Sequence, residues 1–276
     1  MMGEDQSTIG LIAGGGQFPL LIAEAARKHG RRVVAVAHLD ETDPRLTERV
    51  DDIVWIKLGQ LGRLIKAFRS RDVREALMAG TITKKKMFDN IRPDFKGLAI
   101  MSRLAFFHDD DILRAVASEL DREGVAIVSS TRFLPELIAP EGCLTARRPS
   151  RAEMDDIRFG WKMAKSLGQM DIGQCVVVRK RTVLAVEAIE GTDAAILRGG
   201  ELAREKAVVV KVSKPNQDLR FDAPSVGLGT IRTLSRVKGA VLAVEAGKTL
   251  LFDKEAMIAE ADKNRIAVIS FRTPPE

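Results

Sequence analysis

The opening of the chain constrains its fold more than any other feature. An apolar run at residues 7–13 ends in three consecutive glycines, apolar residues then recur at helical spacing up to Gly30, and residues 33–37 form a second apolar run. Strand, glycine turn, helix and strand in this order are typical of the start of a Rossmann-like parallel sheet. We therefore predict an α/β fold.

Short apolar runs continue to alternate with amphipathic segments up to about residue 134. This alternation predicts an N-terminal Rossmann-like domain with a parallel sheet over residues 1–134. Strands are expected at residues 53–56 and 125–128, and helices at residues 61–69, at residues 73–78 and after residues 109–111.

The second half of the chain has a different pattern. Residues 135–150 contain three prolines and are expected to be a linker, or else an ordered loop. A helix is predicted over residues 151–167, followed by β-rich runs, of which residues 175–179 and 182–188 suit a hairpin. A C-terminal α/β domain with a mixed sheet is therefore expected over residues 151–276.

One six-residue sequence occurs twice in this half. Residues 183–188 and 241–246 both read Val-Leu-Ala-Val-Glu-Ala. An internal duplication would explain the match, but two similar half-buried strands explain so short a match more simply.

Composition narrows the possible partners and the compartment. The net charge of +6 among 276 residues favours anionic partners such as nucleotides, phosphorylated lipids or anionic membranes. Basic and aromatic residues do not interleave, so no nucleic-acid partner is expected. The polar N-terminus, the lack of an apolar run of about 20 residues, and two cysteines without CxxC spacing favour a cytoplasmic protein with free thiols.

The glycine run has three interpretations. Gly14, Gly15 and Gly16 stand where a strand meets a helix, so they could bring the backbone and a helix N-terminus close to a phosphate. They could also form a purely structural turn. A nicotinamide cofactor is the third interpretation, but Pro19 occupies the third glycine position of GxGxxG, and Asp40 is only a weak match for a ribose-binding acid.

Two other groups of residues suggest metal ligands at first sight. The consecutive Asp109, Asp110 and Asp111 could bind a cation, but acids at a helix N-terminus are the commoner explanation. The three histidines show no spacing typical of a zinc site.

The densest polar segment runs from residue 211 to residue 230. It begins in an apolar strand and carries Lys211, Lys214, Asp218, Arg220 and Asp222 at or beyond the strand end. Carboxylates among cations, in a loop restrained by proline and glycine, suit the binding and cleavage of a phosphate ester. A solvated surface loop is the alternative. Upstream, residues 190–193 (Glu-Gly-Thr-Asp) look like an ordinary tight turn.

Taken together, four segments resemble one family. They are residues 10–16 (GLIAGGG), 171–174 (DIGQ), 190–193 (EGTD) and 214–227 (KPNQDLRFDAPSVG), in this order. The pattern is similar to the LpxI-type UDP-2,3-diacylglucosamine pyrophosphatases, and residues 214–227 are its most specific part. Residues 80–83 depart from the family pattern after the glycine, which puts the contribution of that loop, including Lys84, in doubt.

The resemblance implies a magnesium-dependent hydrolase of lipid A synthesis that releases UMP and 2,3-diacylglucosamine 1-phosphate (lipid X). It also implies a homodimer, a substrate cleft between two domains and attack by water on the phosphorus attached to the sugar. Asp222 matches the essential acid of the family. Substrate contacts are expected at Gly14, Gly15, Gly16, Gly80, Thr192, Lys211, Gln217, Arg220 and Thr230. Our hypothesis is that Asp222 holds Mg²⁺ or its water, with help from Asp193 or Asp218.

The acyl chains of such a substrate suggest peripheral contact with the inner membrane. Lys84, Lys85 and Lys86 are candidates for contact with anionic lipid, and Phe106 and Phe107 for contact with acyl chains, although core packing is the commoner explanation for such phenylalanines. Two alternatives remain for the function: a nucleotide-sugar or lipid-binding protein without turnover, and an NAD(P)-dependent oxidoreductase.

Overall fold

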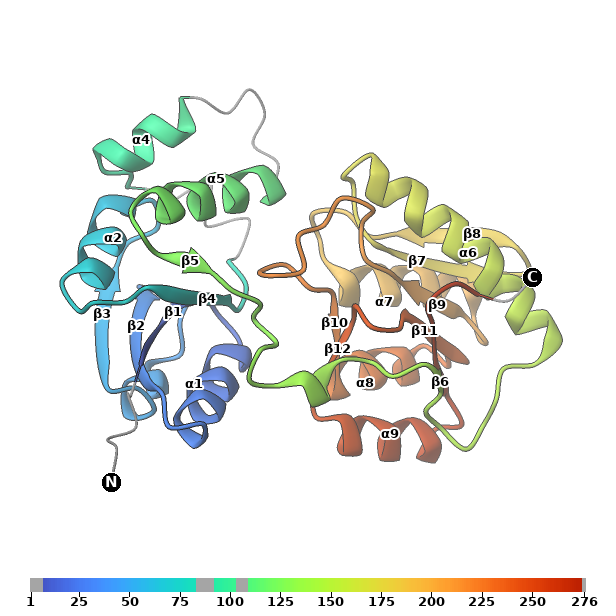
Figure 1. Cartoon of the computed structure of the whole chain (residues 1–276). Coiled ribbons are helices and arrows are strands. Elements are labelled where there is room, and N and C mark those ends of the chain that lie inside the picture. Colours follow the sequence, from blue (N-terminus) through green and yellow to red (C-terminus); the bar gives the residue numbers. More distant parts are fainter. Residues whose placement is uncertain (1–6, 83–91, 103–108, 275–276) are drawn as a thin grey trace. The chain divides into compact units, whose positions relative to one another are not determined.

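The protein is described by a computed structural model that covers residues 7–82, 92–102 and 109–274 (Figure 1). The chain divides into two compact units. Unit 1 comprises Met1–Pro135 and Asp218–Asp222, and unit 2 comprises Glu136–Gln217 and Ala223–Glu276. The short segment 218–222 thus belongs to unit 1, although the chain on both sides of it belongs to unit 2.

Unit 1 is built on a parallel sheet. Within the described residues its five strands have the order β3-β2-β1-β4-β5, and every neighbouring pair is parallel. This is the Rossmann-like arrangement that the opening of the sequence predicts. The strands are β1 (Thr8–Ala13), β2 (Arg32–His38), β3 (Asp52–Ile56), β4 (Glu75–Ala79) and β5 (Ala126–Ile127).

Helices cover both faces of this sheet. Phe68 of α2 (Leu61–Arg69) and Leu120 of α5 (Asp109–Arg122) pack with Val34 and Met78 in one apolar cluster. On the other face lies α1 (Phe18–Lys28), as Figure 1 shows. The short helices η1 (Pro44–Glu48) and α4 (Phe95–Met101) complete the helices of the described part of unit 1.

The helix predicted at residues 73–78 is wrong, because this segment contains strand β4. Glu75–Ala79 aligns with Ile9–Ala13 of β1 in parallel register. An apolar run this short has no periodicity that separates a buried strand from a helix. The long-range pairing with β1 therefore decides the structure of this segment.

The acidic triplet lies in helix α5. The described part of this helix runs from Asp109 to Arg122, so capping of its N-terminus by the three aspartates remains a prediction. The residues predicted to meet lipid, Lys84, Lys85, Lys86, Phe106 and Phe107, lie outside the described residues.

Unit 2 contains a mixed sheet, as predicted. Strand β11 pairs in parallel with β9 and with β13. The pairs β6–β13, β7–β9 and β7–β8 are antiparallel. The predicted hairpin is β7–β8. The strand order in the described residues is β6-β13-β11-β9-β7-β8. The bounds are β6 (Gly142–Cys143), β7 (Cys175–Arg179), β8 (Thr182–Val186), β9 (Val208–Lys211), β11 (Val241–Glu245) and β13 (Ala267–Phe271).

Helices also cover both faces of the unit 2 sheet. One apolar cluster joins α6 (Arg151–Gln169) to alternate residues of β7 and β9. A second cluster joins the opposite face to α7 (Thr192–Ala203), α8 (Leu228–Arg236) and α9 (Lys254–Lys263). Short strands β10 (Ser225–Val226) and β12 (Leu250–Leu251) pair with each other.

Residues 136–150 belong to unit 2, where they contribute β6 and most of the short helix η2 (Pro135–Leu137). Cys143 and Cys175 are free thiols, as predicted. No helix within the described ranges has the length and apolar composition needed to cross a membrane.

Candidate functional site

The glycine loop after β1 is tied to the segment after β4. The amide of Gly14 donates to the Ala79 carbonyl at 2.8 Å, and the amide of Gly15 donates to the Thr81 carbonyl at 2.7 Å. These two N–H groups are therefore already paired. Phosphate binding by this loop remains a prediction, and it would depend on Gly16 and the start of α1 rather than on the two paired amides.

Gly80 has a structural reason to be glycine. Its φ is +91°, and a Cβ atom at this position would lie 2.5 Å from the Gly15 carbonyl oxygen. The Gly14–Gly15 segment and residues 80–81 can approach this closely only because side chains are absent. A substrate contact at Gly80 stays a prediction.

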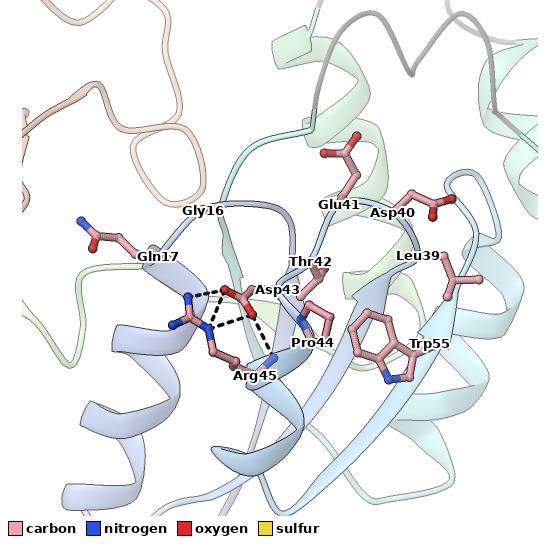
Figure 2. Close-up of a pocket in the computed structure, with 10 residues that line it drawn as sticks. All are labelled: Gly16, Gln17, Leu39, Asp40, Glu41, Thr42, Asp43, Pro44, Arg45 and Trp55. Carbon is pink, nitrogen blue, oxygen red and sulfur yellow. Dashed lines mark hydrogen bonds and ion pairs between the residues drawn. The ribbon is translucent and has the colours of Figure 1, made fainter. Parts of the chain in front are cut away.

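Unit 1 contains an open pocket beside this loop, with a volume of about 880 Å³ (Figure 2). Asp43 and Arg45 form an ion pair of 2.6 Å in it, and hydrogen bonds from Arg45 hold the pKa of Asp43 below its ordinary value. Carboxylates and Trp55 suit hydroxyl groups and a flat ring better than a phosphate. The lining residues are Gly16, Gln17, Leu39, Asp40, Glu41, Thr42, Asp43, Pro44, Arg45 and Trp55.

A buried histidine is hydrogen-bonded to Thr42, which lines the pocket. His38 Nδ1 hydrogen-bonds the Ala13 carbonyl at 2.9 Å, and the Thr42 hydroxyl donates to the same oxygen at 2.6 Å. The His38 amide in turn donates to Thr42 Oγ1 at 2.9 Å. Burial lowers the pKa of His38 below its ordinary value of 6.5, so the neutral imidazole is favoured in the folded state.

This burial predicts a pH-dependent stability. As the pH falls below 6.5, the unfolded chain binds a proton that the folded imidazole does not, so the unfolding free energy of unit 1 should decrease. The contribution is complete above that pH and is lost as the pH falls through the depressed pKa. Denaturation of a Trp161→Phe parent, followed by Trp55 fluorescence at a series of pH values, checks this. A His38→Asn variant with the same pH slope as the wild type would contradict it.

Unit 2 brings two predicted binding residues together. Lys211 lies at the end of β9 and Thr192 at the start of α7, and Lys211 Nζ donates to Thr192 Oγ1 at 2.9 Å. Lys211 Nζ also donates to the Ser225 carbonyl at 2.8 Å. The Thr192 hydroxyl donates to Glu187 Oε1 at 2.6 Å. This lysine–threonine–glutamate cluster places a buried cation beside the N-terminus of a helix.

The predicted turn at residues 190–193 is only partly present: Glu190 lies in a turn, and Thr192 begins α7 with Gly191 as its N-cap. Asp193 occupies the first turn of the same helix. Thr230 has a local bond, since its hydroxyl accepts the Gly227 amide at 3.4 Å near the start of α8. A substrate contact by Thr230 remains a prediction.

The polar loop after β9 is internally bonded. Lys214 pairs with Asp171 at 2.5 Å, and the Lys214 amide donates to the side-chain oxygen of Gln217 at 3.0 Å. Arg220 pairs with Asp218 at 2.7 Å. The hydrogen bonds from the Arg220 side chain lower the pKa of Asp218 below its ordinary value. Hydrogen bonds and ion pairs therefore hold this loop, while Pro215, Asn216 and Arg220 in it are exposed to solvent.

The segment 218–222 is anchored in unit 1. Phe221 is only 8% exposed and lies in the apolar cluster that contains Ile12 and Leu120. The Arg220 carbonyl accepts the Ser130 amide at 2.9 Å. Asp222 follows Phe221 directly, and its amide donates to the Asp218 carbonyl at 3.0 Å. The backbone around Asp222 is thus held by both packing and hydrogen bonds.

The three proposed magnesium ligands, Asp193, Asp218 and Asp222, are not equally available to bind the cation. Carboxylate oxygens suit Mg²⁺, but both oxygens of Asp218 already accept hydrogen bonds from Arg220. Within the described ranges, no group of three or more His, Cys, Asp or Glu side chains is arranged to hold a metal. Asp218 and Asp222 belong to unit 1 and Asp193 to unit 2, so the combined ligand set remains a prediction.

Sequence reasoning missed three features of these sites. It did not single out Glu187, the anchoring role of Phe221, or the pocket that Trp55 lines together with Gly16 and Asp40. The glutamate just after an apolar run was a usable signal, because a buried carboxylate needs a specific partner. Phe221 carried no such signal, since an isolated phenylalanine in a polar loop does not reveal what it packs against.

Solved structures of low similarity align with parts of the chain. The biotin carboxylase subunit of pyruvate carboxylase is 15% identical, with a TM-score of 0.27, and the chain covers 38% of it. N5-carboxyaminoimidazole ribonucleotide synthetase from Thermotoga maritima is 13% identical, with a TM-score of 0.25, and the chain covers 41% of it. The aligned parts are 67% and 66% of this chain. Similarities at this level carry no argument about function.

Sequence families give a specific result. The LpxI N-terminal domain matches residues 8–137, and the LpxI C-terminal domain matches residues 140–269. A relative from Caulobacter vibrioides, UDP-2,3-diacylglucosamine pyrophosphatase LpxI, is 35% identical over 265 residues, which is 92% of this chain and 94% of the relative. The chain therefore belongs to the LpxI family.

Proposed function

We propose that this protein hydrolyses the pyrophosphate bond of UDP-2,3-diacylglucosamine to UMP and lipid X, a step of lipid A synthesis. The observation that carries the proposal is the near full-length match to a relative named for this pyrophosphatase activity. Residues with suitable chemistry, including Lys211 and Asp222, occur in both units.

Charge neutralisation is the first requirement of the reaction. A pyrophosphate resists hydrolysis because its negative oxygens repel an incoming nucleophile. Lys211 and the N-terminus of α7 supply positive charge in unit 2, and Arg220 supplies it in segment 218–222. We propose that these groups bind the phosphates.

Asp222 is proposed as the essential acid of the reaction. Bound Mg²⁺ would neutralise phosphate charge and lower the pKa of a coordinated water. Asp222 would hold the cation or orient the attacking water, and the anchored backbone on either side would keep its carboxylate in place. Asp193 is the second candidate ligand, whereas Asp218 would first have to release Arg220.

The proposed substrate also suggests where the protein works. Its acyl chains belong in a membrane, so we propose a cytoplasmic enzyme that acts peripherally at the inner-membrane surface. A homodimer is likewise proposed from the family resemblance. Size-exclusion chromatography with light scattering and flotation with anionic vesicles would examine these two points.

Release of UMP tests the proposed function. Purified protein with UDP-2,3-diacylglucosamine and Mg²⁺ is expected to form UMP and lipid X in equal amounts, and addition of a chelator should abolish turnover. Chromatography of the nucleotide and mass spectrometry of the lipid follow the products.

Two results would contradict this function. A protein that binds the substrate without releasing UMP would be a binding protein. A spectral change of NAD(P)H that depends on the protein and a substrate would indicate an oxidoreductase.

A further inference from the structure

The repeated sequence Val-Leu-Ala-Val-Glu-Ala provides an internal comparison within unit 2. Its first copy places Glu187 just after β8, and its second places Glu245 at the end of β11. Both residues are buried, with exposures of 9% and 3%. A buried carboxylate is stable only when its oxygens receive hydrogen bonds.

Glu245 has all the partners that its burial requires. Oε1 pairs with Lys248 at 2.9 Å, and Oε2 accepts from Lys165 Nζ at 2.6 Å. The Ser213 amide donates to Oε2 at 2.9 Å. This glutamate therefore has a structural role, because it holds the start of the polar loop.

Glu187 is satisfied on one oxygen only. Oε1 accepts from the Thr192 hydroxyl at 2.6 Å, whereas Oε2 is buried and has no hydrogen-bond partner in the part of the chain that the structure describes. Lys211, the cation of the same cluster, donates to Thr192 and to the Ser225 carbonyl. An unpaired buried carboxylate oxygen is costly, so its retention suggests that a donor arrives with a ligand.

The surroundings of Glu187 indicate what kind of ligand this is. Helix α7 begins directly after its N-cap Gly191, which has no side chain to cap the first backbone N–H groups, so this end of the helix is attractive to an anion. Glu187 itself accepts donors such as hydroxyl or amide N–H groups. An anion and a donor on one ligand describe a sugar phosphate.

Apolar side chains lie next to this cluster. Ile189 follows Glu187 by two residues and is 68% exposed, and Ile172 is 43% exposed. Their segments run side by side, because the Glu187 amide donates to the Cys175 carbonyl at 2.9 Å, and a Cβ on Gly173 would touch the Glu187 carbonyl oxygen. These exposed side chains suit the acyl chains of a lipid-bearing sugar.

We propose that Glu187 recognises the acylated glucosamine of the substrate, with Oε2 accepting a hydrogen bond from an amide N–H or hydroxyl of the sugar. This inference rests on the proposed function for the identity of the sugar. Lys211 and the N-terminus of α7 would face its phosphate. A cation at Oε2 is disfavoured by the charge of Lys211, because Lys211 Nζ and the Glu187 carboxylate are bonded to the same Thr192 hydroxyl.

Calorimetric binding of the two products to the full-length protein tests this assignment. Glu187→Gln should weaken binding of a short-chain 2,3-diacylglucosamine 1-phosphate at least about tenfold, the effect of losing a hydrogen bond to a charged group. Binding of UMP should stay within about twofold. Glu190→Gln is the matched control, because Glu190 is exposed and pairs with Arg198, and it should change neither affinity.

Sugar analogues identify the donor. The analogues replace the 2-amide by an ester, or remove the 4-hydroxyl or the 6-hydroxyl. One analogue should bind the wild type at least about tenfold more weakly than the unmodified sugar phosphate does. The Glu187→Gln variant should bind that analogue and the unmodified sugar phosphate with the same affinity, as expected if Glu187 and the missing group are partners. Circular dichroism and thermal unfolding monitor the fold. If Glu187→Gln does not fold, Glu187→Asp, whose shorter side chain withdraws the oxygen, takes its place in the series.

Three outcomes would overturn the assignment: equal losses for UMP and the sugar phosphate, no loss for the sugar phosphate, or a wild type that tolerates every analogue. The UMP-release assay is scored separately. A wild type that binds the sugar through Glu187 without hydrolysing UDP-2,3-diacylglucosamine would contradict the proposed function alone. Hydrolysis with no coupling to Glu187 would contradict this inference alone.

Discussion

Replacing Asp222 by alanine is expected to lower the turnover of UDP-2,3-diacylglucosamine by about 10²- to 10⁴-fold, the usual range for a positioned acid–base group. This corresponds to roughly 3–5 kcal/mol of activation free energy. The loss should appear in kcat, because the carboxylate is proposed to act on the attacking water or its cation. Asp222→Asn keeps the side-chain volume and should lose nearly as much activity, since charge is the property that matters.

Steady-state release of UMP at saturating Mg²⁺ measures this effect. Asp72→Asn is a suitable control in the same unit, because Asp72 is exposed and has a φ of 54° that asparagine tolerates. It should retain wild-type turnover. Near-wild-type activity of Asp222→Ala would remove this residue from the mechanism.

Replacing Phe221 by alanine should have the largest effect on stability. Its ring is 8% exposed in the apolar cluster of unit 1, and truncation of a buried phenylalanine costs about 3–5 kcal/mol. Activity should fall as well, because Asp222 is the next residue and would lose the anchor of its backbone. Phe221→Leu, which refills most of the volume, should cost less than about 1.5 kcal/mol.

The two tryptophans allow this prediction to be assigned to one unit. Trp55 lies in unit 1 and Trp161 in unit 2, so single-tryptophan parents made by Trp→Phe substitution report on each unit separately. In urea denaturation, Phe221→Ala should lower the midpoint followed by Trp55. An unchanged Trp55 midpoint would show that Phe221 does not stabilise unit 1.

Local sequence was sufficient where a segment carried its own signals. The β-glycine-helix-β opening predicted β1, α1 and β2, and the spacing of apolar residues at 61–69 predicted α2 with its observed bounds. The start of a helix was harder to predict where its N-cap is glycine. Residues 190–193 looked like a turn, yet Thr192 begins α7. The sequence did not reveal this helix start, because Gly191 lacks the side-chain cap that usually marks one.

The candidate site shows the same division. The family resemblance pointed to Lys211, Thr192 and Asp222, but it did not reveal how they are held. Two identical hexapeptides left Glu187 and Glu245 indistinguishable in the sequence. Their different roles depend on partners such as Lys165, which lies on helix α6, 80 residues before Glu245 in the chain.

The sequence by itself determined the α/β class, the parallel sheet of unit 1, the mixed sheet of unit 2 and the family. Those properties follow from periodicity and motifs read within a few residues. Only the tertiary structure decided that residues 75–79 form a strand, that Phe221 packs in unit 1, and that Glu187 keeps one oxygen unpaired. These depend on contacts between segments distant in the chain, and short-range patterns carry no information about such contacts.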